Sequence, residues 1–263
     1  MSLVVLAEEG EGYNPPGSGD FKLPPIIENL EWFTKPYLMA LISVALLVAF
    51  FYFAARRPKM VPSRLQFAGE GIYGFVRRDL ARDIIGSAEF MKFLPLIFSL
   101  FIFIALNNVF GIIPFIQFPT MSLIGFPIAL TLIVWIVYNW VGIRRQGPIG
   151  YFKNMMFPPG VPSWVYILLA PLELVSTVFV RPLTLSLRLF ANMFAGHLLL
   201  IVFILGGEYM LLEGEGLVKV LSIGAFAMGI VMTFFELLVQ VLQAYIFALL
   251  TALYIAGAMS EEH

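Results

Sequence analysis

The sequence has no cysteine and only two histidines among its 263 residues. Without cysteine, disulfides, thiolate catalysis and cysteine-ligated metal sites are all excluded. Charged residues are also scarce, at 13% of the chain, where a soluble domain has about a quarter. The formal net charge is −1, which gives no reason to expect a nucleic-acid partner, and no cofactor is predicted.

Signatures of several function classes are missing as well. The sequence has no P-loop for a nucleotide phosphate and no G-x-S-x-G motif for a serine nucleophile. No internal repeat is visible, although many secondary transporters are built from inverted repeats. These absences argue against a nucleotide hydrolase, a serine hydrolase and a repeat-built transporter.

Apolar residues, in contrast, make up 60% of the chain and are gathered in long runs. Such runs are typical of integral membrane proteins. They predict an all-α membrane protein with about five membrane-embedded helices and one amphipathic surface helix. Residues 7–36 are acidic and rich in glycine and proline, and we expect residues 1–36 to form an extracytoplasmic arm. Residues 37–263 are predicted to form a single membrane domain.

The predicted spans lie at about 37–55, 93–113, 122–141, 165–205 and 217–259. The last two are longer than a bilayer requires, because a 40-residue helix would be ~60 Å long and the hydrocarbon layer is ~30 Å thick. Each run therefore holds either two spans with a hidden turn or one tilted helix. A turn would expose backbone groups to lipid, so we favour two long, steeply tilted helices that form a hairpin.

Residues 63–86 have a different pattern. Ser63 and Gln66 form a potential capping box, and an apolar face recurs at helical spacing. The residues of that face are Leu65, Ile72, Val76, Leu80 and Ile84. The pattern indicates an amphipathic helix on the inner membrane surface or against a partner, and a solvated connector helix is an equal alternative.

The charges beside the spans predict the orientation of the chain. Basic residues follow the first and third spans, and these are Arg56, Arg57, Lys59, Arg144, Arg145 and Lys153. Basic residues beside a span favour the cytoplasmic side. The linker 206–216 contains only acidic charges, which suits the outer side. We therefore expect the N-terminus outside and the C-terminus in the cytoplasm.

Arg188 is the most unusual residue of the long apolar runs, because it lies near the middle of the fourth span. An arginine at the bilayer centre costs ~2.5–3.5 kcal/mol on insertion scales, so a charge there is a functional candidate. At about 100° per residue, Thr184, Arg188 and Asn192 share one helical face, and His197 points the opposite way.

The last span carries a second polar stripe, since Glu236, Gln240 and Gln243 share one face. Glu173 and Arg181 add charge before Arg188. Such a stripe of titratable and amide groups favours a hydrated proton path over a substrate pocket. For a single glutamine or asparagine, simple bonding between helices is an equal alternative.

Two further groups of polar and aromatic residues are weaker candidates. Asn107 and Asn108 could line the outer part of such a path, but hydrogen bonding between helices is the simpler explanation. The aromatic residues of the third span and the following segment are interpreted as an interface belt, and they are Trp135, Tyr138, Trp140 and Trp164.

Three stretches together resemble subunit a of the F-type ATP synthase, the stator channel of its membrane sector. They are "RPLTLSLRLFANMFAGH" (181–197), "LLVQVLQAYIFALLTALYIAGAMSEEH" (237–263) and "NNVFGIIP" (107–114). The resemblance covers nearly the whole chain apart from the N-terminal arm. It implies a subunit that is not catalytic by itself and that sits in a bacterial plasma membrane.

The resemblance also implies roles for single residues. Arg188 matches the family's essential arginine, which faces the rotating ring of c subunits, and Gln243 and Asn192 match amides near it. His197 and Glu236 stand where many bacterial members carry glutamate and histidine, so their types are exchanged. Glu173 matches an upstream acidic residue, but it lies 15 residues before Arg188 instead of 14.

The mechanism implied by the resemblance is rotary. Protons enter an outer half-channel past Glu173, His197 and Glu236, with Gln240 and Asn108 as supporting polar groups. They protonate a c-subunit carboxyl group and leave through an inner half-channel after nearly a full rotation. Arg188 separates the half-channels. The implied partners are the c ring, the b subunits of the peripheral stalk, the remaining subunits and membrane lipid, and any ATP chemistry belongs to other subunits.

Two alternatives compete with this interpretation. A secondary transporter would bind a small anion at Arg188, and it would require internal repeats and broken helices. An intramembrane hydrolase would use Ser186 and His197, which lie about 16 Å apart along a continuous helix and cannot form a hydrogen bond.

Overall fold

The computed structural model describes residues 33–56, 59–113, 118–157 and 165–259, together with Gly17 and Ile26. Most of the predicted N-terminal arm and Trp164 lie outside these residues. Within the described ranges every regular element is a helix, which confirms the predicted all-α fold.

Five helices of the described chain are long and apolar enough to cross a membrane. They are α1 (Lys35–Ala55), α4 (Phe90–Val109), α5 (Gly125–Gln146), the continuous helix Tyr166–Leu212, and α9 (Leu217–Met259). The fourth consists of α7 (Tyr166–Val175), a π segment (Ser176–Val180) and α8 (Arg181–Leu212). Neither of the last two runs contains the hidden turn that was the alternative, and the fourth extends over about 70 Å.

α8 continues to Leu212, past the predicted end at 205. Gly206 and Gly207 directly follow the predicted end, and glycine is a poor helix former. In the structure, a Cβ atom on Gly207 would lie only 3.3 Å from the Cβ of Ala225 on α9. A small residue here lets two helices approach closely, and this packing outweighs the weak helix propensity.

The chain divides into two compact units. Unit 1 contains residues 1–46, 104–123 and 190–243, and unit 2 contains residues 47–103, 124–189 and 244–263. The helices α1, α4, α8 and α9 therefore each contribute one part to each unit.

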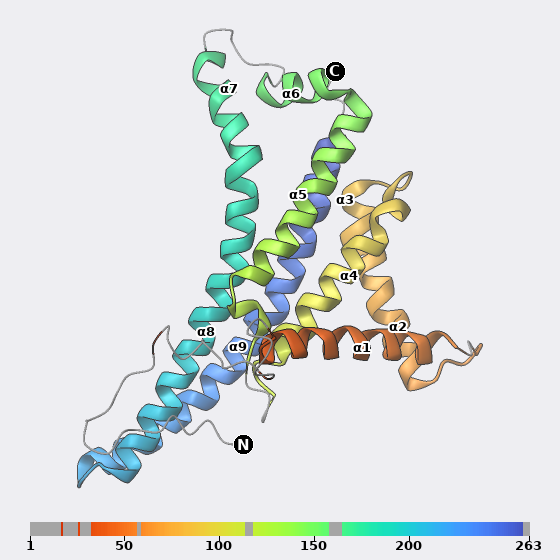
Figure 1. Ribbon diagram of the computed structural model, residues 1–263. Coiled ribbons are helices and arrows are strands. Elements are labelled where there is room, and N and C mark those ends of the chain that lie inside the picture. The colour runs from red at the N-terminus through yellow and green to blue at the C-terminus, as the bar shows by residue number, and fades with distance from the viewer. Residues whose placement is uncertain are drawn as a thin grey trace. The chain divides into compact units, whose positions relative to one another are not determined.

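The helical hairpin of unit 1 consists of the second part of α8 and the first part of α9 (Figure 1). The two helices are joined by residues 213–216, where Gly216 has a φ of 55° that a residue without a side chain adopts at little cost. Gly207 and Gly229 lie where the two helices pass each other. The hairpin of the last two helices is as predicted.

The predicted amphipathic segment belongs to unit 2 and is split into α2 (Arg64–Phe75), a π segment (Val76–Arg82) and α3 (Asp83–Ile85). The second half of its apolar face is buried: Val76 and Leu80 have no exposed surface and pack in one cluster with Leu94 of α4 and Ala252 of α9. At the start of α2, Leu65 is 41% exposed. The chain itself therefore covers the second half of this face.

The capping box of α2 is only half formed. Ser63 Oγ accepts a bond from the backbone N–H of Gln66 at 3.3 Å, as predicted. The Gln66 side chain does not return to Ser63. Its amide nitrogen donates to Glu70 at 2.7 Å and to the backbone oxygen of Lys59 at 3.3 Å. Gln66 thus holds the segment around Lys59, which precedes α2, in place.

A short helix that was not predicted, α6 (Pro148–Met156), follows α5 and contacts α5 and α7. The ring of Tyr151 lies against Gly142 of α5, where it leaves no room for a Cβ atom. Its hydroxyl donates to Asn139 Oδ1 at 3.1 Å. Burial raises the pKa of Tyr151, partly opposed by the nearby Arg181 charge, so the phenol stays a hydrogen-bond donor.

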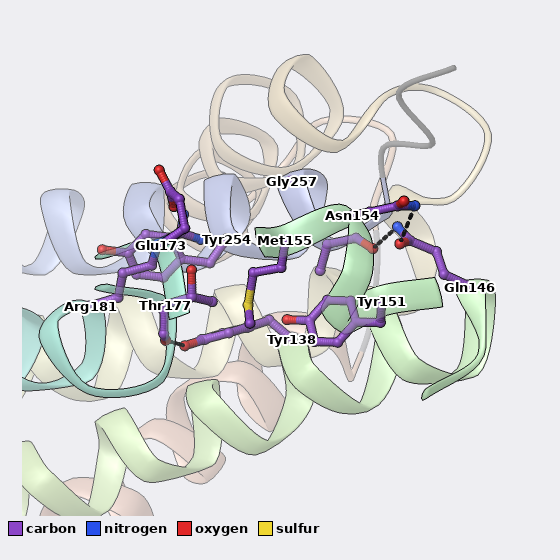
Figure 2. A pocket seen from close by; sticks show the side chains of 11 residues that line it. Tyr138, Gln146, Tyr151, Asn154, Met155, Glu173, Thr177, Arg181, Tyr254 and Gly257 are labelled. Carbon is purple, nitrogen blue, oxygen red and sulfur yellow. Dashed lines mark hydrogen bonds between the residues drawn. The ribbon is translucent and has the colours of Figure 1, made fainter. Parts of the chain in front are cut away.

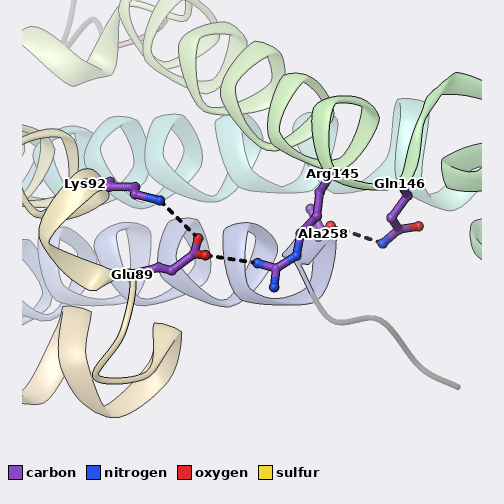
Figure 3. Close-up of polar contacts among 5 residues, drawn as sticks. All are labelled: Glu89, Lys92, Arg145, Gln146 and Ala258. Atoms are coloured by element: carbon purple, nitrogen blue, oxygen red, sulfur yellow. Dashed lines mark hydrogen bonds and ion pairs between the residues drawn. The ribbon is translucent and has the colours of Figure 1, made fainter.

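The end of α5 is tied to neighbouring elements of unit 2 by polar contacts (Figure 3). Arg145 lies 3.5 Å from Glu89, and Lys92 lies 3.7 Å from the same carboxylate. Gln146 donates to the backbone oxygen of Ala258 near the end of α9 at 3.3 Å.

Candidate functional site

A group of buried polar side chains lies on α8 and α9 within unit 1. His197 and Glu236 are each 4% exposed, and Gln240 is fully buried. The Gln240 amide nitrogen donates to Glu236 Oε1 at 3.1 Å, one helical turn away. The predicted stripe of the last helix is therefore present as a bonded pair that faces the interior of this unit.

Glu236 lies directly against the part of α8 that carries His197. A Cβ atom on Gly196 would be 3.5 Å from Cγ of Glu236, so the glycine leaves space for the carboxyl side chain. His197 has a second neighbour in Phe118, whose ring centre is 6.3 Å from that of the imidazole. The structure thus brings the two predicted relay residues into one region.

Gln243 and Asn192 join the same two helices one turn further along. The Asn192 amide nitrogen donates to Gln243 Oε1 at 2.7 Å, and Gln243 is 2% exposed. This contact connects two residues that lie far apart in the sequence, and periodicity alone did not predict it.

The two asparagines at the end of α4 bind different partners. Asn108 donates to the backbone oxygen of Gln240 at 3.3 Å, which connects α4 to the polar part of α9. Asn107 donates to Ser43 Oγ of α1 at 2.8 Å, and Ser43 donates to its own helix at Ala40. Sequence reasoning missed Ser43, although a lone serine in an otherwise apolar span was a visible signal.

Several buried polar atoms of this cluster have no hydrogen-bond partner among the described residues. They are Asn108 Oδ1, Glu236 Oε2, Gln240 Oε1 and Gln243 Nε2. Buried polar groups are normally satisfied, and ordered water is the usual partner when no protein atom is. The cluster can therefore hold water molecules next to a carboxyl group and an imidazole, which is the chemistry of proton transfer. Among the described residues, no group of acidic, histidine or cysteine side chains could hold a metal ion.

Arg188 lies in unit 2, where its surroundings differ. Its neighbours Leu185 and Leu189 are buried, but Arg188 and Leu187 are exposed. Within the described part of the chain, no carboxylate forms an ion pair with Arg188. Arg188 is thus an exposed charged residue in the middle of a membrane-spanning helix.

Glu173 lies elsewhere in unit 2, at a cavity of about 240 Å³ (Figure 2). Arg181 lines the same cavity, and its guanidinium carbon is 5.7 Å from the ring centre of Tyr254. The other lining residues are Tyr138, Gln146, Tyr151, Asn154, Met155, Thr177, Gly257 and Ala258. Glu173 therefore belongs to a different unit from His197 and Glu236.

The interface-belt interpretation is wrong for Tyr138, which is only 2% exposed. Its hydroxyl donates to the backbone oxygen of Thr177 at 2.8 Å, so the polar end of the ring is satisfied inside the protein. Trp140 is 63% exposed, which agrees with the belt interpretation. The sequence pattern alone did not show which of these two aromatic residues of α5 is buried and which is exposed.

The chain is similar to known proteins along its full length. The sequence profile of the family described as ATP synthase A chain matches residues 37–256. ATP synthase subunit a of Nocardioides sp. is 51% identical over 271 residues, covering 99% of this chain and 98% of that relative. The corresponding subunit of Pseudarthrobacter chlorophenolicus is 44% identical, covering 100% and 99%, and that of Streptomyces lividans is 42% identical, covering 97% and 91%.

Proposed function

Because this chain belongs to the ATP synthase A chain family, we propose that it is the proton-channel stator subunit of a rotary ATP synthase. In this role it passes protons to and from the carboxyl groups of a c ring through two offset half-channels. It is a multi-pass membrane protein that acts with the rest of the complex. The driving force for rotation is the transmembrane potential, about 2.3 kcal/mol per charge per 100 mV, together with the pH difference.

The observation that carries this proposal is that Arg188 is exposed inside an apolar span. Facing lipid, this charge would be costly, so a partner must cover it. A carboxyl group on a c subunit fits, because an arginine remains cationic and attracts the anionic form of any carboxyl group that approaches. Arg188 would then release the proton from each arriving carboxyl group and prevent direct leakage between the half-channels.

We assign the buried cluster of unit 1 to the outer half-channel. His197 and Glu236 would exchange protons with water held at the unsatisfied oxygen and nitrogen atoms of the cluster. Gln240 orients the carboxyl group through its 3.1 Å bond, and Asn108 positions that part of α9. Asn192 and Gln243 hold α8 and α9 together one turn further on.

Glu173 requires a different assignment from the outer path that the resemblance suggested. It lines the same cavity as Gln146, which is the last residue of α5 and directly follows Arg144 and Arg145. Basic residues at this end favour the cytoplasmic side. On the proposed orientation this cavity lies toward the inner side, so we propose that Glu173 contributes to the inner half-channel.

The proposal includes the surroundings of the chain. The partners are the c ring, the b subunits and the remainder of the complex, within the lipid of a bacterial plasma membrane. The N-terminus is outside and the C-terminus is in the cytoplasm. ATP chemistry takes place on other subunits, and this chain contributes only proton translocation.

The alternatives fit the geometry less well. A transporter that binds an anion at Arg188 would enclose that side chain, whereas here it is exposed. For the hydrolase, the Ser186 hydroxyl donates to the backbone oxygen of Leu183 at 3.0 Å, and Ser186 and His197 belong to different units.

Cysteine cross-linking tests the proposal directly, because this chain has no cysteine of its own. We expect Leu187→Cys, next to Arg188, to cross-link to a cysteine placed beside the c-subunit carboxyl group in the assembled complex. Val48→Cys is the matched control, because Val48 is an equally apolar, 64% exposed residue on α1. Assembly without any cross-link at position 187 would contradict the proposal.

A further inference from the structure

The helix that carries Arg188 changes its hydrogen-bonding pattern before Arg181. In the π segment Ser176–Val180, the backbone N–H of Arg181 donates to the oxygen of Ser176, five residues earlier. In a regular α-helix this N–H would donate to the oxygen of Thr177, four residues earlier. The Thr177 oxygen therefore loses its usual donor.

The next backbone oxygen, that of Val178, lacks its usual donor for a different reason. The donor would be the N–H of residue 182, which is a proline and has no N–H. Two adjacent carbonyl groups of a membrane-spanning helix are thus left without the ordinary bond. Such a group is costly in a bilayer, where no water replaces the missing donor.

Side chains of α5 supply both missing donors. The Tyr138 hydroxyl donates to the Thr177 oxygen at 2.8 Å, as drawn in Figure 2. Trp135 Nε1 donates to the Val178 oxygen at 3.1 Å. Trp135 and Tyr138 are three residues apart and therefore lie on the same face of α5. Each donor meets one of the two open carbonyl groups.

The π segment also sets which side of the helix the later residues face. In a regular α-helix, the side chain of Arg181 would point about 80° away from that of Glu173, beyond two whole turns. A π segment accommodates one extra residue, which reduces this angle to about −20°. In agreement, Glu173, Thr177 and Arg181 all line one cavity. Arg188 follows Arg181 by about two turns of α8, so the same segment determines the direction of Arg188.

We propose that Trp135 and Tyr138 are positioning residues for Arg188, because their bonds to Val178 and Thr177 hold the π segment in place. This inference rests on the proposed function, since it concerns how Arg188 is presented to the rotor. It gives a role to two aromatic side chains that the sequence suggested were merely interfacial.

The test removes the two donors and keeps the rings. Trp135→Phe and Tyr138→Phe are combined in the assembled ATP synthase, and proton-driven ATP synthesis is measured in vesicles. We expect a loss of roughly tenfold or more, because a displacement of about 1 Å can cost up to 10²-fold. The matched controls are Trp140→Phe and Tyr52→Phe, whose side chains are 63% and 58% exposed. They should retain normal synthesis.

A distance measurement separates positioning from a direct part in proton transfer. Spin labels at Leu172→Cys and Leu187→Cys flank the π segment, and the other subunits are freed of cysteine. In the double variant, we expect the label-to-label distance distribution to shift or broaden. Reduced synthesis with an unchanged distribution would overturn the proposal, as would normal synthesis.

A deletion provides a suppressor. Removal of Val178 turns the bond from Arg181 to Ser176 into an ordinary four-residue α-helical bond and preserves the facing of Arg181 and Arg188. We therefore expect this deletion to restore synthesis in the double variant, and failure to do so in an assembled complex would contradict the inference. If Arg188→Ala proved harmless while the label distances still shifted, the proposed function would fail and the positioning of the helix would stand.

Discussion

In unit 1 His197 of α8 and Glu236, Gln240 and Gln243 of α9 are buried, whereas in unit 2 Arg188 is exposed. Glu236, Gln240, Asn192 and Gln243 have partners within the protein, and some of their atoms remain open to water. Arg188 has no carboxylate partner among the described residues. The comparison teaches that one region keeps its polar atoms inside the protein, while the other leaves a charge outside, and the proposed function assigns proton transfer to the first and contact with the rotor to the second.

The largest effect is expected at the exposed charge. Arg188→Ala should reduce proton-driven ATP synthesis to background while the complex still assembles, because the residue is exposed and forms no ion pair with a described carboxylate. Synthesis in vesicles and co-purification of the other subunits are the measurements. Thr184→Ala is a matched control on the same face of α8, and normal synthesis by Arg188→Ala would remove the basis of the comparison.

The second effect concerns the buried pair of unit 1. Glu236→Gln should slow proton flux by roughly 10²-fold, because a carboxamide keeps the shape but cannot transfer a proton. In a double-mutant cycle with His197→Ala, we expect a coupling of about 0.5–3 kcal/mol. Strictly additive losses would show that the two residues act separately.

A smaller effect is expected where hydrogen bonding only supports the path. Asn192→Ala and Gln243→Ala each remove the 2.7 Å bond between α8 and α9, which is worth about 1 kcal/mol, or roughly a fivefold change. Proton flux and thermal stability of the complex are the readouts. The double variant should be hardly worse than either single one, and a loss equal to the sum would argue against a shared bond.

The smallest effect is expected at the surface of unit 2. Glu89→Ala removes the ion pairs with Arg145 and Lys92, but all three side chains are partly exposed. Exposed ion pairs contribute about 0–1 kcal/mol, so the melting temperature should hardly change. A large loss of stability here would mean that this end of α5 depends on charge more than its exposure indicates.

Much of this arrangement was predictable from local signals. Long uncharged runs predicted the five membrane-spanning helices. The period of the α-helix placed Glu236 and Gln240 on one face. The partners of Asn107, Asn192 and Tyr138 were not predictable, because hydrogen bonds between distant segments leave no periodic trace. The π segment was also missed, although Glu173 stood one residue too far from Arg188 and Pro182 marked a missing donor.

The sequence alone determined that the chain is a helical membrane protein with a charge deep in an apolar span, because hydropathy and helical period are local properties. Only the tertiary structure decided which polar groups face the interior and which face outward. That choice depends on donors and acceptors that meet across helices. Trp135 and Tyr138 illustrate this, since their role follows from two open carbonyl groups on another helix.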